Sequence, residues 1–147
     1  MTMKVTGDAD LIANFEEVRK RVIERATDAV VEGGKLVQRT AKDYSPLDRG
    51  NLENSIRREE QITRDGANIV IGVDDNEPVP EEPGKRVGDY ATQMHEGDYN
   101  LGPGSRAKAN ELGVEVGRKY VERALEDNAD EILRLVEDEV RKALFGG

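Results

Sequence analysis

The sequence predicts an α+β domain, in which a small antiparallel sheet is covered by a long N-terminal and a long C-terminal helix. Helical periodicity runs from residue 10 to 44 and returns from residue 114 to 145. Between these stretches, a hairpin signal separates two segments with strand character. The chain has 147 residues and no cysteine, so we expect one domain, residues 1–147, that disulfides do not hold together.

The first helix is predicted by apolar residues that recur at three- and four-residue steps, beginning with Leu11 and Phe15. The glycine pair 33–34 should weaken its middle, because each glycine costs about 1 kcal/mol relative to alanine in a helix. We therefore expect a kink at this pair, or the close approach of another backbone. Pro46 should end the helix, because the residue before a proline is pushed out of the α region.

A hairpin is predicted after the turn 45–50. Residues 52–62 have a weak strand pattern, and residues 68–73 (Asn-Ile-Val-Ile-Gly-Val) are rich in β-branched residues, which favour strands. Asp65-Gly66 lies between the two segments and is typical of a tight hairpin turn. A sheet with so few strands has open edges, and open edges favour pairing with a neighbouring chain.

Two loops are predicted between the hairpin and the last helix. Residues 74–88 contain three prolines among acidic residues and indicate a long, exposed and mobile loop. Residues 89–96 fit a short helix or a strand. A second loop starts at the glycine-rich segment 97–104, and we expect mobility to extend through residue 110.

The last helical stretch runs from Val114 to Phe145. Asn128 interrupts its apolar stripe and resembles an N-cap, with Glu131 three residues further on. This pattern fits either two helices or one kinked helix.

The composition predicts a small core and an acidic surface. Hydrophobic residues make up 36% of the chain, aromatic residues 4%, and the formal net charge is −9. Such a balance argues against a basic footprint for DNA or acidic lipids, whereas an acidic wall would let a duplex slide past. No apolar run approaches the roughly 20 residues of a membrane span, so no membrane role is expected.

The sequence offers little chemistry, and we predict no catalytic, cofactor-binding or metal-binding residues. His95-Glu96 could act as an acid–base pair, but the zinc motif H-E-x-x-H fails because Tyr99 occupies the place of the second histidine. The acidic segment 74–77 lacks the ligand spacing of a calcium loop. Arg106 and Lys108 lie in the second predicted loop, where solvent is favoured over DNA or an acidic neighbour as their partner.

Three short blocks stand out by their residue types and their order. The first joins the end of the first helix to the turn and to residue 56, the second covers residues 90–97, and the third covers residues 119–125. Their defining members are Pro46, Asp48, Gly50, Leu52, Ser55 and Ile56, then Tyr90, Ala91, His95, Glu96 and Gly97, and finally Tyr120, Ala124 and Leu125.

In this order the blocks resemble the tail-completion family of tailed bacteriophages and related viruses, whose members are also described as neck, head–tail joining or minor capsid proteins. The family pattern has threonine where this chain has Arg49. The resemblance implies a structural virion protein without enzymatic activity, made in the host cytoplasm and located in the neck or tail. It implies a homo-oligomeric ring, often sixfold, that joins the head connector or stopper to the tail terminator or tail tube. Genomic DNA would pass through this ring without sequence-specific binding.

Three alternatives remain open at the level of sequence. The first is another virion role, such as a tail terminator or a minor capsid subunit. The second is an acidic cellular protein-binding module, which a stable monomer that captures a basic partner would favour. The third is a small hydrolase acting through His95 and Glu96, which loss of activity in a folded His95→Ala variant would favour.

Overall fold

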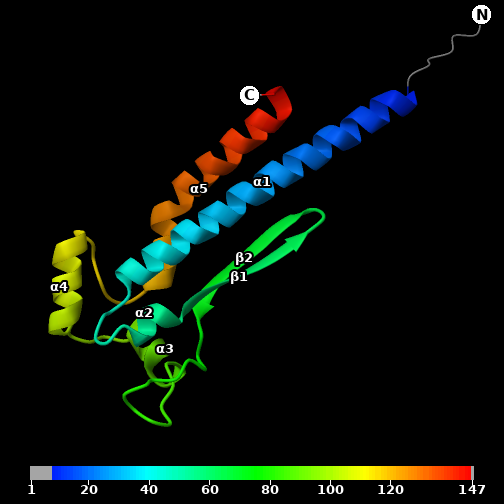
Figure 1. The fold of residues 1–147 in the computed structure, drawn as a ribbon. Coiled ribbons are helices and arrows are strands. Elements are labelled where there is room, and N and C mark those ends of the chain that lie inside the picture. Colours follow the sequence, from blue (N-terminus) through cyan, green and yellow to red (C-terminus); the bar gives the residue numbers. More distant parts are fainter. Residues whose placement is uncertain (1–7, 147) are drawn as a thin grey trace, which may run out of the picture.

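The computed structural model describes residues 8–146. Figure 1 shows an elongated molecule with two parts: a rod of two long helices and a hairpin, and a head of short helices and loops at one end. The predicted α+β class is confirmed, with two long helices and a two-stranded antiparallel sheet. The elements are α1 (Asp8–Tyr44), α2 (Asn51–Ser55), β1 (Ile56–Thr63), β2 (Gly66–Val73), α3 (Gly88–Glu96), α4 (Pro103–Leu112) and α5 (Tyr120–Phe145).

The rod has three layers, with α1 in the middle (Figure 1). α5 runs antiparallel to α1, since the Tyr44 hydroxyl donates to Asp127 at 2.7 Å near one end and the Arg21 Nε donates to the Ala143 carbonyl at 3.0 Å near the other. The hairpin packs on a different face of α1, where the Gln38 amide donates to the Ile56 carbonyl at 3.0 Å. The sheet is thus covered directly by α1, and α5 covers α1.

The glycine pair 33–34 lies between α5 on one side and the hairpin on the other. α1 continues through it without a break. A Cβ on Gly33 would lie 3.0 Å from the Ile132 side chain of α5, and a Cβ on Gly34 would lie 2.6 Å from the Ile69 side chain of β2. The pair therefore allows the close approach of side chains from both neighbouring layers, and not of a backbone.

Gly34→Val should destabilise the protein by about 2 kcal/mol, because overpacking a close contact outweighs the gain in helix propensity. The Ile69 side chain is branched at Cβ and cannot swing away freely. Urea unfolding followed by circular dichroism measures the change. Lys35→Val is the matched control, because it places the same side chain at the next, exposed position of α1. Equal stabilities for the two variants would contradict the close packing at Gly34.

The segment predicted as the start of the first strand is partly helical, and this prediction is wrong for residues 52–55. Gly50 adopts the left-handed conformation with φ 84° and precedes α2 as its N-cap, and its carbonyl accepts a hydrogen bond from the Asn54 amide at 2.9 Å. The strand starts only at Ile56. Leu52 and Ile56 are nevertheless both buried, because a spacing of four also shares a face in a helix. The hairpin is confirmed, but its turn lies one residue earlier than Asp65-Gly66: Thr63 pairs with Gly66, so Arg64 and Asp65 form the turn.

The segment 74–88 is not exposed throughout, which corrects the prediction. Val79 and Val87 are 5% and 0% exposed and belong to the core. The Val79 amide donates to the Lys85 carbonyl at 3.0 Å, which folds the segment back on itself. The mobility of this segment stays a prediction.

The second predicted loop contains a helix, α4, that the sequence did not indicate. Pro103 lies in its first turn, where a proline is tolerated, and Gly113 ends it at φ 66°. The prediction failed because residues 103–112 lack an apolar stripe. The residues 89–96, predicted as helix or strand, lie in α3.

The C-terminal element is one helix that begins at Tyr120, six residues later than predicted. Asn128 lies within it and is not an N-cap, so the alternative of two helices is wrong. Its amide donates to the Thr40 hydroxyl at 3.0 Å and to the Ala124 carbonyl at 2.7 Å. Asn128 thus interrupts the apolar stripe because it ties α5 to α1 by a hydrogen bond. Within residues 8–146, no helix has the length and apolarity that crossing a bilayer requires.

Candidate assembly site

The three sequence blocks meet in one place, at the junction between the rod and the head. Each block supplies at least one fully or nearly fully buried side chain to the same hydrophobic cluster. This cluster fixes the positions of α2, α3 and the start of α5 around the C-terminal part of α1. Its buried members are Val37, Ala41, Leu52, Ile56, Val79, Val87, Ala91, Tyr120 and Ala124.

The remaining block residues surround this cluster or face solvent. Pro46 and Ser55 are buried, and the Ser55 hydroxyl donates to the Leu52 carbonyl at 2.6 Å. Partly buried positions are taken by Tyr90, His95, Gly97 and Gly50, while Asp48, Glu96 and Leu125 are exposed. Asp48 and Leu125 are therefore free to contact another molecule.

His95 and Glu96 lie together at the edge of the head. The His95 Nδ1 is 2.7 Å from a Glu96 carboxylate oxygen, and the imidazole packs edge-on against the Tyr120 ring at a centroid distance of 4.8 Å. Lys119 lies 2.6 Å from the other carboxylate oxygen. A hydrogen bond from Lys119, and a smaller contribution from His95, lower the pKa of the Glu96 carboxyl group. Within residues 8–146, no group of three His, Cys, Asp or Glu residues could hold a metal ion.

Lys108 is buried, and the prediction that it faces solvent is wrong. Its side chain is 8% exposed, and its ammonium group donates to the Lys42 carbonyl, to the Ser45 carbonyl at 3.0 Å and to the Glu53 carboxylate at 2.7 Å. This one cation joins α4 to the C-terminal end of α1 and to α2. Arg106 is exposed, and its guanidinium donates to the Leu101 carbonyl at 2.7 Å.

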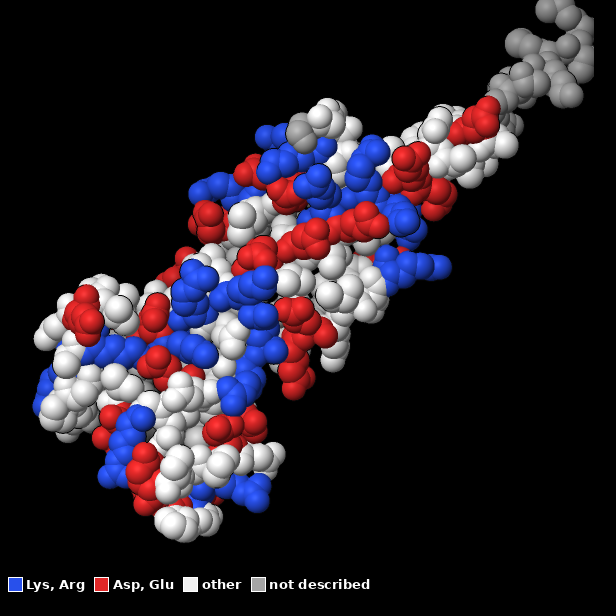
Figure 2. Space-filling model, in the orientation of Figure 1, with Lys and Arg blue, Asp and Glu red and all other residues white. Residues whose placement is uncertain are grey.

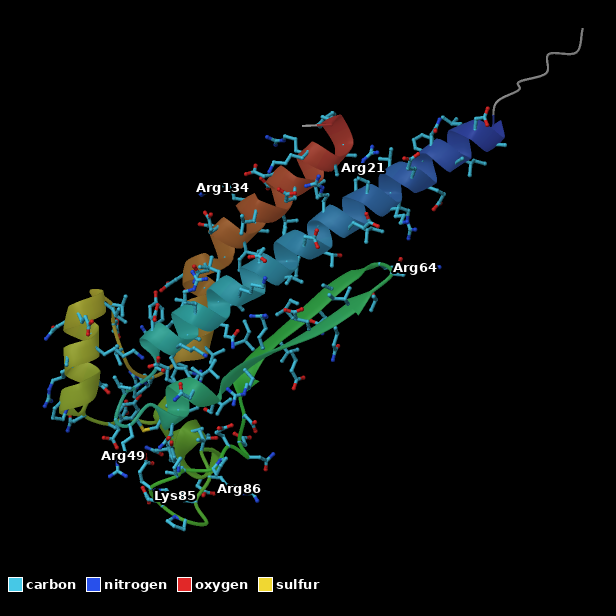
Figure 3. All side chains as sticks on the ribbon, in the orientation of Figure 1. Arg21, Arg49, Arg64, Lys85, Arg86 and Arg134 are labelled. Carbon is cyan, nitrogen blue, oxygen red and sulfur yellow. The ribbon has the colours of Figure 1, made fainter. Side chains whose placement is uncertain are left out.

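A cleft of about 360 Å³ opens between the turn after α1 and the helices of the head. Leu47, Leu52 and Met94 give it an apolar wall, and Arg49 and Lys85 also line it. Figure 3 shows these two cations at the head end of the molecule. A cleft with apolar walls and charged lining residues is suited to an apolar side chain from a neighbouring protein.

The opposite end of the rod exposes large apolar side chains. Residues 9–17 of α1 are all exposed, with Leu11, Ile12 and Phe15 at 55%, 62% and 65%. At the end of α5, Phe145 is 79% exposed. In Figure 1 the start of α1 extends beyond both α5 and the hairpin. Exposed apolar groups that lie together are typical of surfaces that bind other proteins.

These features define an α+β protein built around one long helix, with apolar surface at both ends. Comparison with known protein families identifies its family. Residues 9–93 match the HK97-gp10-like model, described as "Bacteriophage HK97-gp10, putative tail-component". This match covers more than half of the chain, which therefore belongs to the HK97-gp10-like family and is a tail-related structural protein of bacteriophages. No curated protein and no solved structure matches the chain significantly.

The matched residues cover the first block completely and the second block up to Gln93. The third block lies outside the match, although Tyr120 and Ala124 pack in the same core as the first two blocks. The family confirms the resemblance found in the sequence. Membership in this family indicates that the chain is a virion protein and that it contacts other virion proteins.

Proposed function

We propose that the chain is the subunit of a homo-oligomeric ring at the head–tail junction, where it joins the capsid connector to the tail and lets DNA pass. The observation that carries this proposal is the isolated hairpin. Within residues 8–146 the sheet has only β1 and β2, so each strand has one edge without a strand partner. Open edges pair readily with another chain, and a closed ring would cover them.

The head supplies further contacts in this proposal. The cleft lined by Leu47, Leu52 and Met94 would receive a side chain of the connector or of the tail terminator. Segments 74–88 and 97–110 would contact neighbouring subunits. Mobility of these segments in the free protein would be restricted on assembly. Their anchored residues, such as Val79 and Val87, would stay in place.

The charge of the chain fits the passage of DNA through such a ring. The net charge is −9, and Figure 2 shows side chains of both charges on the visible face. A lumen of this kind would attract phosphates weakly, so the duplex would slide. The proposed role is mechanical and not enzymatic, and it involves no cofactor.

Light scattering coupled to size-exclusion chromatography, followed by negative-stain electron microscopy, tests the ring. We expect closed rings, in equilibrium with the monomer, as protein concentration rises. An antibody against the protein should label the neck of tailed particles. Labelling elsewhere on the particle would favour a minor capsid role, and no labelling of particles would overturn the virion function.

A further inference from the structure

We propose that the exposed start of α1, residues 9–18 (the overhang), binds the C-terminal end of α5 in a second copy of the chain. This inference rests on the proposed function, because it names a contact through which the ring subunits would associate. The overhang is the acidic and apolar partner in this contact. The end of α5 is the basic and apolar partner.

The overhang continues the face of α1 that α5 covers elsewhere. Leu11, Phe15 and Val18 follow each other at four- and three-residue steps, in the same series that reaches Gly33, where α1 contacts Ile132 of α5. α5 ends near Arg21, whose guanidinium donates to the Ala143 carbonyl. The same stripe thus extends beyond the end of α5, where Leu11 and Phe15 are more than half exposed.

The charged residues of the overhang are all acidic. Asp10, Glu16 and Glu17 are the charged residues among residues 9–18, and all three are exposed to solvent. A partner for this segment must offer apolar side chains flanked by cations, because opposite charges align two surfaces and like charges separate them.

The C-terminal end of α5 offers this combination. Leu144 and Phe145 are 48% and 79% exposed. Arg141 and Lys142 precede them on the last turn and are both exposed, and Arg21 of α1 reaches the same turn through the Ala143 carbonyl. Figure 3 shows Arg21 on α1 beside the end of α5.

Charge also limits how two copies can pair. Two overhangs that paired with each other would bring acidic segments together, which disfavours a contact of overhang with overhang. An overhang that binds the end of α5 joins two different surfaces instead. Made once between each pair of neighbours, this contact repeats from subunit to subunit and closes into a ring when the rotation permits, whereas the same contact made twice by one pair of copies would give a twofold dimer.

A charge-swap experiment on the full-length chain tests the contact by sedimentation velocity at a series of protein concentrations. One variant carries Glu16→Lys and Glu17→Lys, and the other carries Arg141→Glu and Lys142→Glu. Each alone should weaken self-association by on the order of tenfold, because two exposed ion pairs become like-charge contacts. An equimolar mixture of the two should regain association, because each variant then meets an opposite charge.

A control variant carries Glu126→Lys and Asp130→Lys, at exposed positions in the first half of α5, and should associate like the unchanged protein. Circular dichroism verifies that all variants fold. The contact is overturned if both charge-swap variants associate like the unchanged protein, or if their mixture fails to regain association. Neither result contradicts the proposed ring, which could form through other contacts. An unchanged protein that stays monomeric at every concentration also overturns the contact, and the labelling of particles then decides the virion function separately.

Discussion

Replacing Lys108 with methionine should lower the free energy of unfolding by about 3 kcal/mol. The ammonium group donates to two backbone carbonyls and to the Glu53 carboxylate in a site where the lysine is 8% exposed. Methionine keeps most of the volume but leaves these acceptors without their donor. Removal of one partner of a buried charge pair is strongly destabilising because the other partner remains away from water. Glu53 is 32% exposed, so solvent relieves part of this loss.

Urea unfolding followed by circular dichroism measures this change. Lys20→Met is the matched control: its side chain is 78% exposed, and its ion pair with Glu24 spans 4.0 Å. A pair of this kind contributes at most about 0.5 kcal/mol. If Lys108→Met were as stable as Lys20→Met, Lys108 would not hold α4 against α1 in solution.

The long elements could be predicted from the sequence because each has its own apolar stripe. α1 is predicted almost to the residue, since Pro46 ends it and its periodicity is regular. The hairpin follows from Asp65-Gly66 alone. Such signals are local in the sequence, and the structure agrees with them because the packing of the long helices favours the same elements.

The head could not be predicted in the same way, because its order comes from distant contacts. α4 has no apolar stripe, and the burial of Lys108 depends on acceptors that lie at least 55 residues away in the chain. The short helix α2 replaces a predicted strand because Gly50 takes a left-handed conformation, and periodicity does not reveal backbone conformation. No local signal indicated that Lys108 was buried.

The candidate site shows the same division. The blocks around Pro46 and Tyr90 could be recognised in the sequence, and they proved to pack in one core. The overhang is not distinguishable in the sequence from the rest of the helix, because an apolar stripe along a helix does not show how far its covering helix extends. Only the end of α5 near Arg21 reveals that Leu11 and Phe15 have no cover from α5.

Tyr120→Ala should lower the free energy of unfolding by about 4 kcal/mol. Tyr120 is the largest fully buried side chain, and it contacts the imidazole of His95 within the core where the three blocks meet. Alanine would leave a cavity that the fixed ends of α2, α3 and α5 cannot fill. Urea unfolding at pH 7 measures the loss.

Tyr120→Phe separates the ring from its hydroxyl, and it should keep or raise the stability by up to about 1 kcal/mol. The hydroxyl has no hydrogen-bond partner among residues 8–146, and burial raises the pKa of the phenol far above its ordinary value. An unpaired buried hydroxyl destabilises the folded state, so its removal should not harm it. Together the two variants would show that Tyr120 acts through packing. A loss of more than about 1 kcal/mol in Tyr120→Phe would instead mean that the hydroxyl is hydrogen-bonded in solution.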